Sequence, residues 1–167
     1  MGVNKLVRRV RHLGLACALV LWGTWATAQT PLLRSTGQRL YLPIYSHIWH
    51  GDVDRSGKPT RMLMSVSVSI RNTDPSRSIR VLSAQYFDTD GKRIREYLPS
   101  PRLIAPMGTY ELFIPREDDS GGSGANFVIV WKADQATSPP MVEALHANLP
   151  AGRSIAFISQ ARPIPDD

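Results

Sequence analysis

Residues 62–71 read MLMSVSVSIR, and this alternation decides the fold class. Every second residue is apolar, and the residues between are mostly serine. A period of two places the apolar side chains on one face of a β-strand and the polar ones on the other face, toward water. The run ends at Asn72-Thr73-Asp74-Pro75, residues that favour a turn. We therefore predict a half-buried antiparallel strand here.

Short alternating or apolar runs recur along the chain, and none beyond residue 28 has a long helical period. Asp90-Gly91 between two runs predicts a hairpin, because glycine adopts positive φ without strain. Pro43 marks the first strand as an edge, because proline has no N–H to donate. About eight short strands at this spacing predict an all-β domain at residues 40–164, an immunoglobulin-like β-sandwich, with a small β-barrel as the alternative. The expected strands are 40–48, 62–71, 78–87, 92–98, 103–104, 109–114, 127–133, 142–147 and 154–161.

The first 28 residues have the layout of a secretory signal peptide. A basic cluster precedes an apolar run at residues 13–25, and Ala26-Thr27-Ala28 forms an A-x-A cleavage site. The apolar run is well short of the ~20 residues that cross a bilayer, so a membrane anchor is the weaker alternative. We expect cleavage after Ala28, export to the periplasm and no transmembrane span in the mature chain. Residues 29–39 are expected to be a flexible segment, and residues 163–167 a loose end.

The leader also carries the only cysteine, Cys17, and part of the positive charge. A lipoprotein would be anchored through Cys17, but Gly14 stands where a lipidation site has an apolar residue. Cleavage leaves no thiol, which excludes disulfides, thiol chemistry and cysteine-based metal sites. It also leaves 16 Lys+Arg against 14 Asp+Glu, a formal charge of +2 in place of +6. Nucleic acid is therefore not an expected partner.

Four spaced motifs occur in the mature chain. They are YSHIWHGD at 45–52, SIRNTD at 69–74, REYLP at 95–99 and SGGSGANF at 120–127. With these motifs in this order, the chain from about Leu40 to Ile164 resembles an uncharacterised bacterial exported family, the domain of unknown function numbered 3124. The resemblance implies a stand-alone exported domain. It implies no reaction, ligand or catalytic residue.

His47, His50 and Asp52 are candidate metal ligands, because histidine with carboxylate suits Zn²⁺ or Cu²⁺. Residues three apart in a strand face opposite sides, so the two histidines converge only if the strand breaks near Trp49. The alternative is a structural role for both. No third histidine is near in sequence, although folding could bring His146 to them.

A glycine-rich loop at residues 118–126 is the second candidate site. It is not a phosphate-binding P-loop, because Ala125 stands where that motif has lysine. Its N–H groups could form a nest for an anion or a peptide carboxylate, and the alternative is a turn that needs several positive φ angles. Arg95, on the predicted hairpin, could hold the same ligand or protect a sheet edge. The candidate ligand-binding residues are Ser120, Gly121, Gly122, Ser123, Gly124, Asn126 and Arg95.

No complete catalytic motif is present, so we expect a non-enzymatic module rather than an enzyme. The expected function is that of a binding or structural module of the periplasm, without a cofactor, whose partner is a protein, a peptide or a small ligand. The alternative is a His-based protein that binds Zn or Cu, or a metalloenzyme built on the same residues.

Overall fold

The computed structural model describes residues 33–165, which contain twelve β-strands and no helix. None of these residues therefore forms a helix that could span a membrane. The predicted signal peptide, its cleavage site after Ala28, Cys17 and residues 29–32 lie outside the described residues. The strands are β1 (Ser35–Ile44), β2 (His47–Val53), β3 (Pro59–Leu63), β4 (Ser65–Arg71), β5 (Ile79–Phe87), β6 (Arg93–Glu96), β7 (Arg102–Ile104), β8 (Thr109–Ile114), β9 (Ala125–Thr137), β10 (Met141–Asn148), β11 (Ile155–Gln160) and β12 (Arg162–Ile164).

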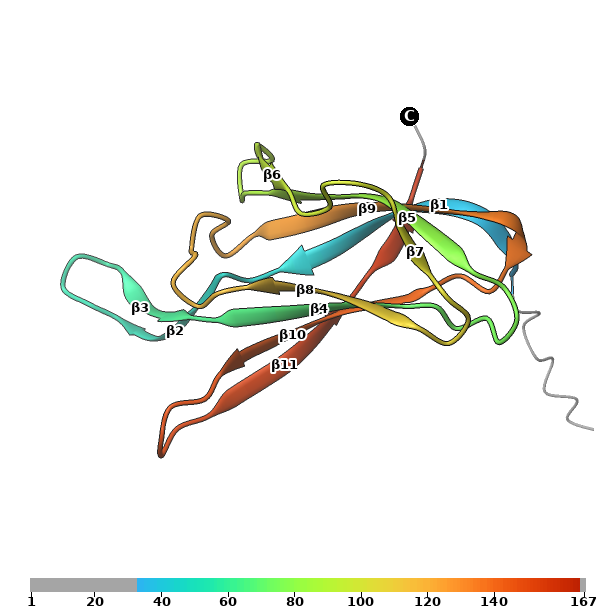
Figure 1. Cartoon of the computed structure of the whole chain (residues 1–167). Coiled ribbons are helices and arrows are strands. Elements are labelled where there is room, and N and C mark those ends of the chain that lie inside the picture. Colours follow the sequence, from blue (N-terminus) through green and yellow to red (C-terminus); the bar gives the residue numbers. More distant parts are fainter. Residues whose placement is uncertain (1–32, 166–167) are drawn as a thin grey trace, which may run out of the picture. The chain divides into compact units, whose positions relative to one another are not determined.

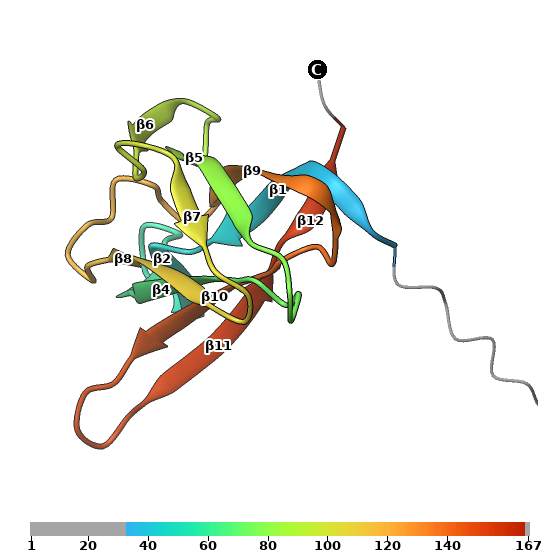
Figure 2. The same ribbon diagram turned by 45° about the vertical axis from the view of Figure 1, so that its right-hand side comes forward.

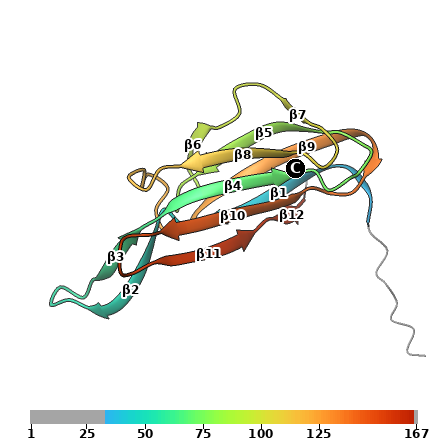
Figure 3. The ribbon, with the colours of Figure 1, turned by 60° about the horizontal axis from the view of Figure 1, so that its bottom comes forward.

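The strands form three antiparallel sheets (Figure 1). A six-stranded sheet has the order β12-β1-β9-β5-β6, with β7 also paired to β5, and a four-stranded sheet has the order β11-β10-β4-β8 (Figure 2). The hairpin β2–β3 is a sheet of its own and projects from one end of the domain (Figure 3). The all-β prediction is confirmed. The small-barrel alternative is wrong, because no sheet among the described strands closes on itself.

The two larger sheets contribute to one hydrophobic core. On β4 the residues predicted to face inward, Val66, Val68 and Ile70, are fully buried. On β9 the large side chains Phe127 and Trp131 are buried in the same cluster. Full burial of one such side chain contributes about 1.5–3 kcal/mol. The alternation in the sequence therefore sets which face of each strand lies in the core.

Two predicted strands are divided at the point where the hairpin leaves the sheets. The expected strand 40–48 is split beside Ser46 into β1 and β2, and the expected strand 62–71 is split at Met64 into β3 and β4. The N–H of Met64 donates to the carbonyl of Ser46 (2.9 Å), and the N–H of Ser46 donates to the carbonyl of Gly122 (3.0 Å). These bonds hold the base of the hairpin. β2 and β3 pair only with each other among the described strands.

Both ends of the domain are more ordered than the sequence predicts. β1 begins at Ser35, so residues 35–39 of the expected flexible segment form a strand. Pro163 and Ile164 of the expected loose end belong to β12, which pairs with β1 around Leu40. Main-chain pairing with β9 and β12 orders these segments, although their side chains show no alternation.

The turn after β4 is held by the buried carboxylate of Asp74. One oxygen accepts the hydroxyl of Thr137 (2.6 Å), and the other accepts the N–H groups of Ser76 (2.9 Å) and Arg77 (3.0 Å). These bonds, with that from Thr137 the largest cause, hold the pKa of Asp74 well below its usual range. The side-chain amide of Asn72 donates to the carbonyl of Arg77 in the same turn and to the carbonyls of Ile104 and Ala105 at the end of β7. The motif at residues 69–74 thus has a structural role: it links the turn after β4 to the end of β7 and to the end of β9.

The opposite faces of β4 should respond differently to the same charge. We expect Val66→Asp to lower the free energy of unfolding by more than about 3 kcal/mol, because it buries a carboxylate without a partner. Ser67→Asp, on the outward face, should change it by less than about 1 kcal/mol. Urea unfolding followed by the fluorescence of buried Trp131 measures both. Equal losses in the two variants would contradict the assigned register.

Candidate functional site

β11 and β12 form nearly one continuous strand, which passes from the four-stranded sheet to the six-stranded sheet at Ala161. The N–H of Ala161 still donates to Val142 of β10 (2.9 Å), and the next residue, Arg162, already pairs with Tyr41 of β1. Successive residues of a strand direct their main-chain groups to alternate sides. Ala156, Ile158 and Gln160 therefore direct theirs to the side of Arg162. β11 has no partner strand on that side among the described residues.

Pro43 explains why the pairing between β1 and β12 stops. The register pairs Arg39 with Ile164 and Tyr41 with Arg162, so the next pair would be Pro43 with Gln160. Proline has no N–H for such a bond. The carbonyl of Pro43 instead accepts the hydroxyl of Ser159 (2.6 Å). The prediction that the first strand is an edge is wrong for β1 as a whole, because β1 lies between β12 and β9; only from Pro43 onward does its side toward β11 have no partner strand in the described part of the chain.

Tyr45, which follows the end of β1 on this side, also has its N–H bonded within the protein. The N–H of Tyr45 donates to Nε2 of His146 on β10 (3.1 Å). The imidazole of His146 is fully buried and stacks on Phe157 at 4.6 Å, with the Tyr45 ring edge-on at 5.5 Å. Burial lowers the pKa of His146 to about 4. A neutral histidine therefore stands between β1 and the four-stranded sheet.

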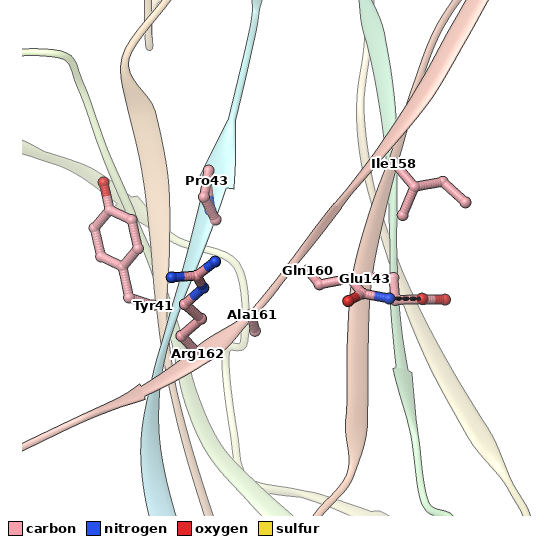
Figure 4. Close-up of a pocket in the computed structure, with 7 residues that line it drawn as sticks. All are labelled: Tyr41, Pro43, Glu143, Ile158, Gln160, Ala161 and Arg162. Atoms are coloured by element: carbon pink, nitrogen blue, oxygen red, sulfur yellow. Dashed lines mark hydrogen bonds between the residues drawn. The ribbon is translucent and has the colours of Figure 1, made fainter.

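A groove of about 660 Å³ lies where β1 and β11 diverge. In Figure 4, Tyr41, Pro43 and Arg162 lie on one side of the β11–β12 strand, and Ile158 lies on the other with the Glu143–Gln160 pair. The Gln160 amide donates to the Glu143 carboxylate (3.0 Å). Arg162 forms no ion pair within the described residues. The lining residues are Tyr41, Pro43, Glu143, Ile158, Gln160, Ala161 and Arg162.

The groove opens onto an apolar row across the outer face of the four-stranded sheet. Ile158 (59% exposed) is paired with Leu145 (45%) on β10, Leu145 with Ser67 on β4, and Ser67 with Phe113 (58%) on β8. Ser65, Ala147 and Ala156 occupy the adjacent row. An exposed apolar row beside an open groove is a surface on which another molecule can bind.

The predicted metal ligands are not brought together. His47 is buried with its ring edge-on to Trp49 (4.9 Å), whereas His50 and Asp52 are exposed on the projecting hairpin. β2 continues through Trp49 without the required break, so the two histidines face opposite sides. Within residues 33–165, no three His, Cys, Asp or Glu side chains are grouped to hold a metal ion. Burial, with a smaller effect of Arg61, lowers the pKa of His47.

The glycine-rich loop is packed against the β5–β6 turn. Thr89 donates its N–H to the carbonyl of Gly121 (2.9 Å), and its hydroxyl accepts the N–H of Gly124 (3.0 Å). Gly122 has φ 77°, and its N–H donates to the carbonyl of Asp119 (3.0 Å). A Cβ on Gly121 would collide with the hydroxyl of Tyr86. Two of the N–H groups that an anion would need are therefore already bonded.

The structure does bring Arg95 to this loop. Its guanidinium forms an ion pair with Asp118 (2.7 Å), whose other oxygen accepts the hydroxyl of Ser120 (2.6 Å). Asn126 is buried at the start of β9, and Ser123 is half-buried in the turn before it. Arg95 on β6 and Ser120 in the loop thus both bond the carboxylate of Asp118.

Comparisons with known proteins identify a family without an assigned activity. The family model described as "Protein of unknown function (DUF3124)" matches residues 37–164. No curated protein matches the sequence. A solved structure, "Crystal Structure of Thermotoga maritima 1070", is similar with a TM-score of 0.41 and 10% identity, and the match covers 75% of this chain and 92% of that chain. A similarity of this size does not establish a shared fold or function.

The buried imidazole of His146 should make stability depend on pH. The unfolded chain binds a proton near pH 6.5 and the folded chain only near pH 4, so the free energy of unfolding should fall as pH drops through this window. The loss should approach roughly 3 kcal/mol, at about 1.4 kcal/mol per unit of pKa shift. Urea unfolding at several pH values measures it. His146→Gln should flatten most of the slope, with His47 giving a remainder; an unchanged slope would contradict the assignment.

Proposed function

The chain belongs to the family of proteins of unknown function DUF3124, and we propose that it is an exported, non-enzymatic binding module of the periplasm. Its ligand is an extended polypeptide segment, which adds as a strand beside β11 in the groove. The unpaired side of β11, facing that groove, is the observation that carries this proposal. The two larger sheets form an immunoglobulin-like sandwich, a reading supported by their shared core and antiparallel pairing.

Main-chain groups supply the first part of the recognition. Ala156, Ile158 and Gln160 each direct an N–H and a carbonyl away from β10, and Ile158 and Gln160 line the groove. A segment lying alongside them would continue the four-stranded sheet by one strand. In this mode of binding, main-chain hydrogen bonds provide affinity and side-chain contacts provide specificity. β1 cannot fill this position itself, because Pro43 has no N–H and the N–H of Tyr45 is bonded to His146.

Side chains around the groove define what the segment should contain. Tyr41, Pro43 and Ile158 offer apolar surface, which suits a branched or aromatic side chain. Arg162 has a guanidinium without an acidic partner in the described residues, which suits a carboxylate. Glu143 is bonded to Gln160, and its negative charge disfavours a carboxylate on its side of the β11–β12 strand. The acidic part of the ligand should therefore lie on the side of Arg162. The preferred ligand is therefore an extended segment with an apolar residue near an aspartate or glutamate.

The other two candidate sites are less suited to binding a ligand. The glycine-rich loop has its main chain bonded within the protein, and Asp118 neutralises Arg95. His47 and His50 lie on opposite faces of β2. Among the described residues, the groove beside β11 combines main-chain groups without a partner strand, apolar surface and a guanidinium without an acidic partner, which neither of the other sites does.

Peptides selected from a displayed random library on the purified protein test the proposal. Enriched peptides should carry an apolar residue near an acidic one. Ile158→Pro should weaken their binding at least about tenfold, because it removes an N–H that faces the groove and leaves the pairing with β10 intact. The matched control Ile158→Val keeps the N–H and an apolar side chain and should bind nearly as the unmodified protein does.

Amide hydrogen exchange of the same samples locates the bound segment. Without peptide, the amides of Ala156, Ile158 and Gln160 should exchange quickly, whereas those of Phe157 and Ser159, which face β10, should be protected. Peptide should protect the first three. The absence of any enriched peptide, or equal binding to Ile158→Pro, would overturn the proposal.

A further inference from the structure

The four-stranded sheet has a second open edge, at β8. The N–H of Asn72 donates to the carbonyl of Gly108 (2.9 Å), so the pairing of β4 with β8 uses even-numbered residues of β8. Thr109, Glu111 and Phe113 therefore direct their N–H and carbonyl groups away from β4. β8 is the last strand on this side, and no partner strand covers it in the described part of the chain.

The edges of the six-stranded sheet are protected, and that of β8 is not. β12 has Pro163 facing outward, because the residues on either side of it are those aligned with Arg39 and Tyr41. β6 is short and carries Arg93 and Arg95, and β7 has only three residues. β8 has six residues without proline, lysine or arginine, and its register with β4 has no shift. An edge without these protective features is a template for pairing with another strand.

We propose that β8 pairs with β8 of a second copy of this chain, antiparallel about a two-fold axis. In the register centred on Leu112, Leu112 lies opposite Leu112 of the other copy and Glu111 lies opposite Phe113. The pairs Glu111–Phe113 then form hydrogen bonds through their outward main-chain groups. A register centred on Glu111 would place two carboxylates opposite each other, which is unfavourable. A formal charge of +2 for residues 29–167 does not oppose the association.

The dimer joins two four-stranded sheets into one continuous sheet. Phe113, which is 58% exposed, becomes covered by the partner strand. The contact is small compared with the roughly 1,200 Å² of a stable interface, so the dimer should form only at high protein concentration. The groove beside β11 remains open at each end of the joined sheet. This inference concerns a different edge from the proposed peptide site, so either can fail without the other.

Sedimentation velocity over a concentration series up to about 1 mM, a range suited to a small interface, tests the dimer. The unmodified protein should shift from monomer to dimer. Glu111→Pro removes an outward N–H from each copy and should weaken the dimer at least about tenfold. Glu111→Thr removes the same carboxylate, keeps the N–H and should dimerise as the unmodified protein does. Persistent monomer, or equal effects of the two variants, would overturn the proposal.

A cross-linking measurement keeps the proposal testable if Glu111→Pro does not fold. Residues 29–167 contain no cysteine, so introduced thiols are the only ones. An oxidised mixture of Glu111→Cys and Phe113→Cys chains should form a mixed disulfide dimer several times faster than either chain alone. Met141→Cys, exposed on β10, is the control and should cross-link slowly. Equal rates for all combinations would overturn the two-fold pairing of β8.

Discussion

A strand that pairs with one sheet on one side and with a second, diverging sheet on its other side leaves part of each side without a partner strand, and this constraint shapes the domain. β11 and β12 together form nearly one strand, which follows β10 at first and β1 at the end. Pro43 sets the point of separation, because it offers no N–H to Gln160 and its carbonyl is bonded to Ser159. His146 then takes the N–H of Tyr45. The groove is thus a consequence of how two sheets share one segment of chain.

Much of the fold could be predicted from the sequence, because burial leaves a periodic pattern. The alternation in residues 62–71 identified the buried face of β4, and Asp90-Gly91 identified the β5–β6 hairpin. The turn of the β2–β3 hairpin carries the turn residues Asp54 and Gly57, but its strands are mostly exposed and do not alternate, so the hairpin was not predicted. β12 could not be predicted either, since a three-residue strand with a proline has no pattern and is ordered only by pairing with β1.

The candidate site was less predictable, for a related reason. Histidines and glycines are conspicuous in a sequence, and here tertiary contacts occupy most of them: Gly121 lies against Tyr86, and His47 lies beside Trp49. The four motifs that carry the family resemblance likewise supply contacts that join distant segments, such as the ion pair of Arg95 with Asp118. The groove instead depends on main-chain groups that lack a partner. Such groups can be found only from the pairing of strands that are distant in the sequence. Pro43 was the single residue that indicated them in the sequence.

Both open edges belong to the four-stranded sheet, and both are short. β8 is bounded by Pro106 and Pro115, and β11 by the turn at Pro150 and by the pairing of β12 with β1. Each edge directs three residues outward, and a hydrogen bond contributes only about 1 kcal/mol net. Main-chain pairing alone therefore falls short of the roughly 8 kcal/mol that micromolar affinity requires. Side chains must supply the rest, Ile158 and its neighbours at one edge and Phe113 at the other. Short edges of this kind select a partner by its side chains, whereas a long flat edge would pair with any extended chain.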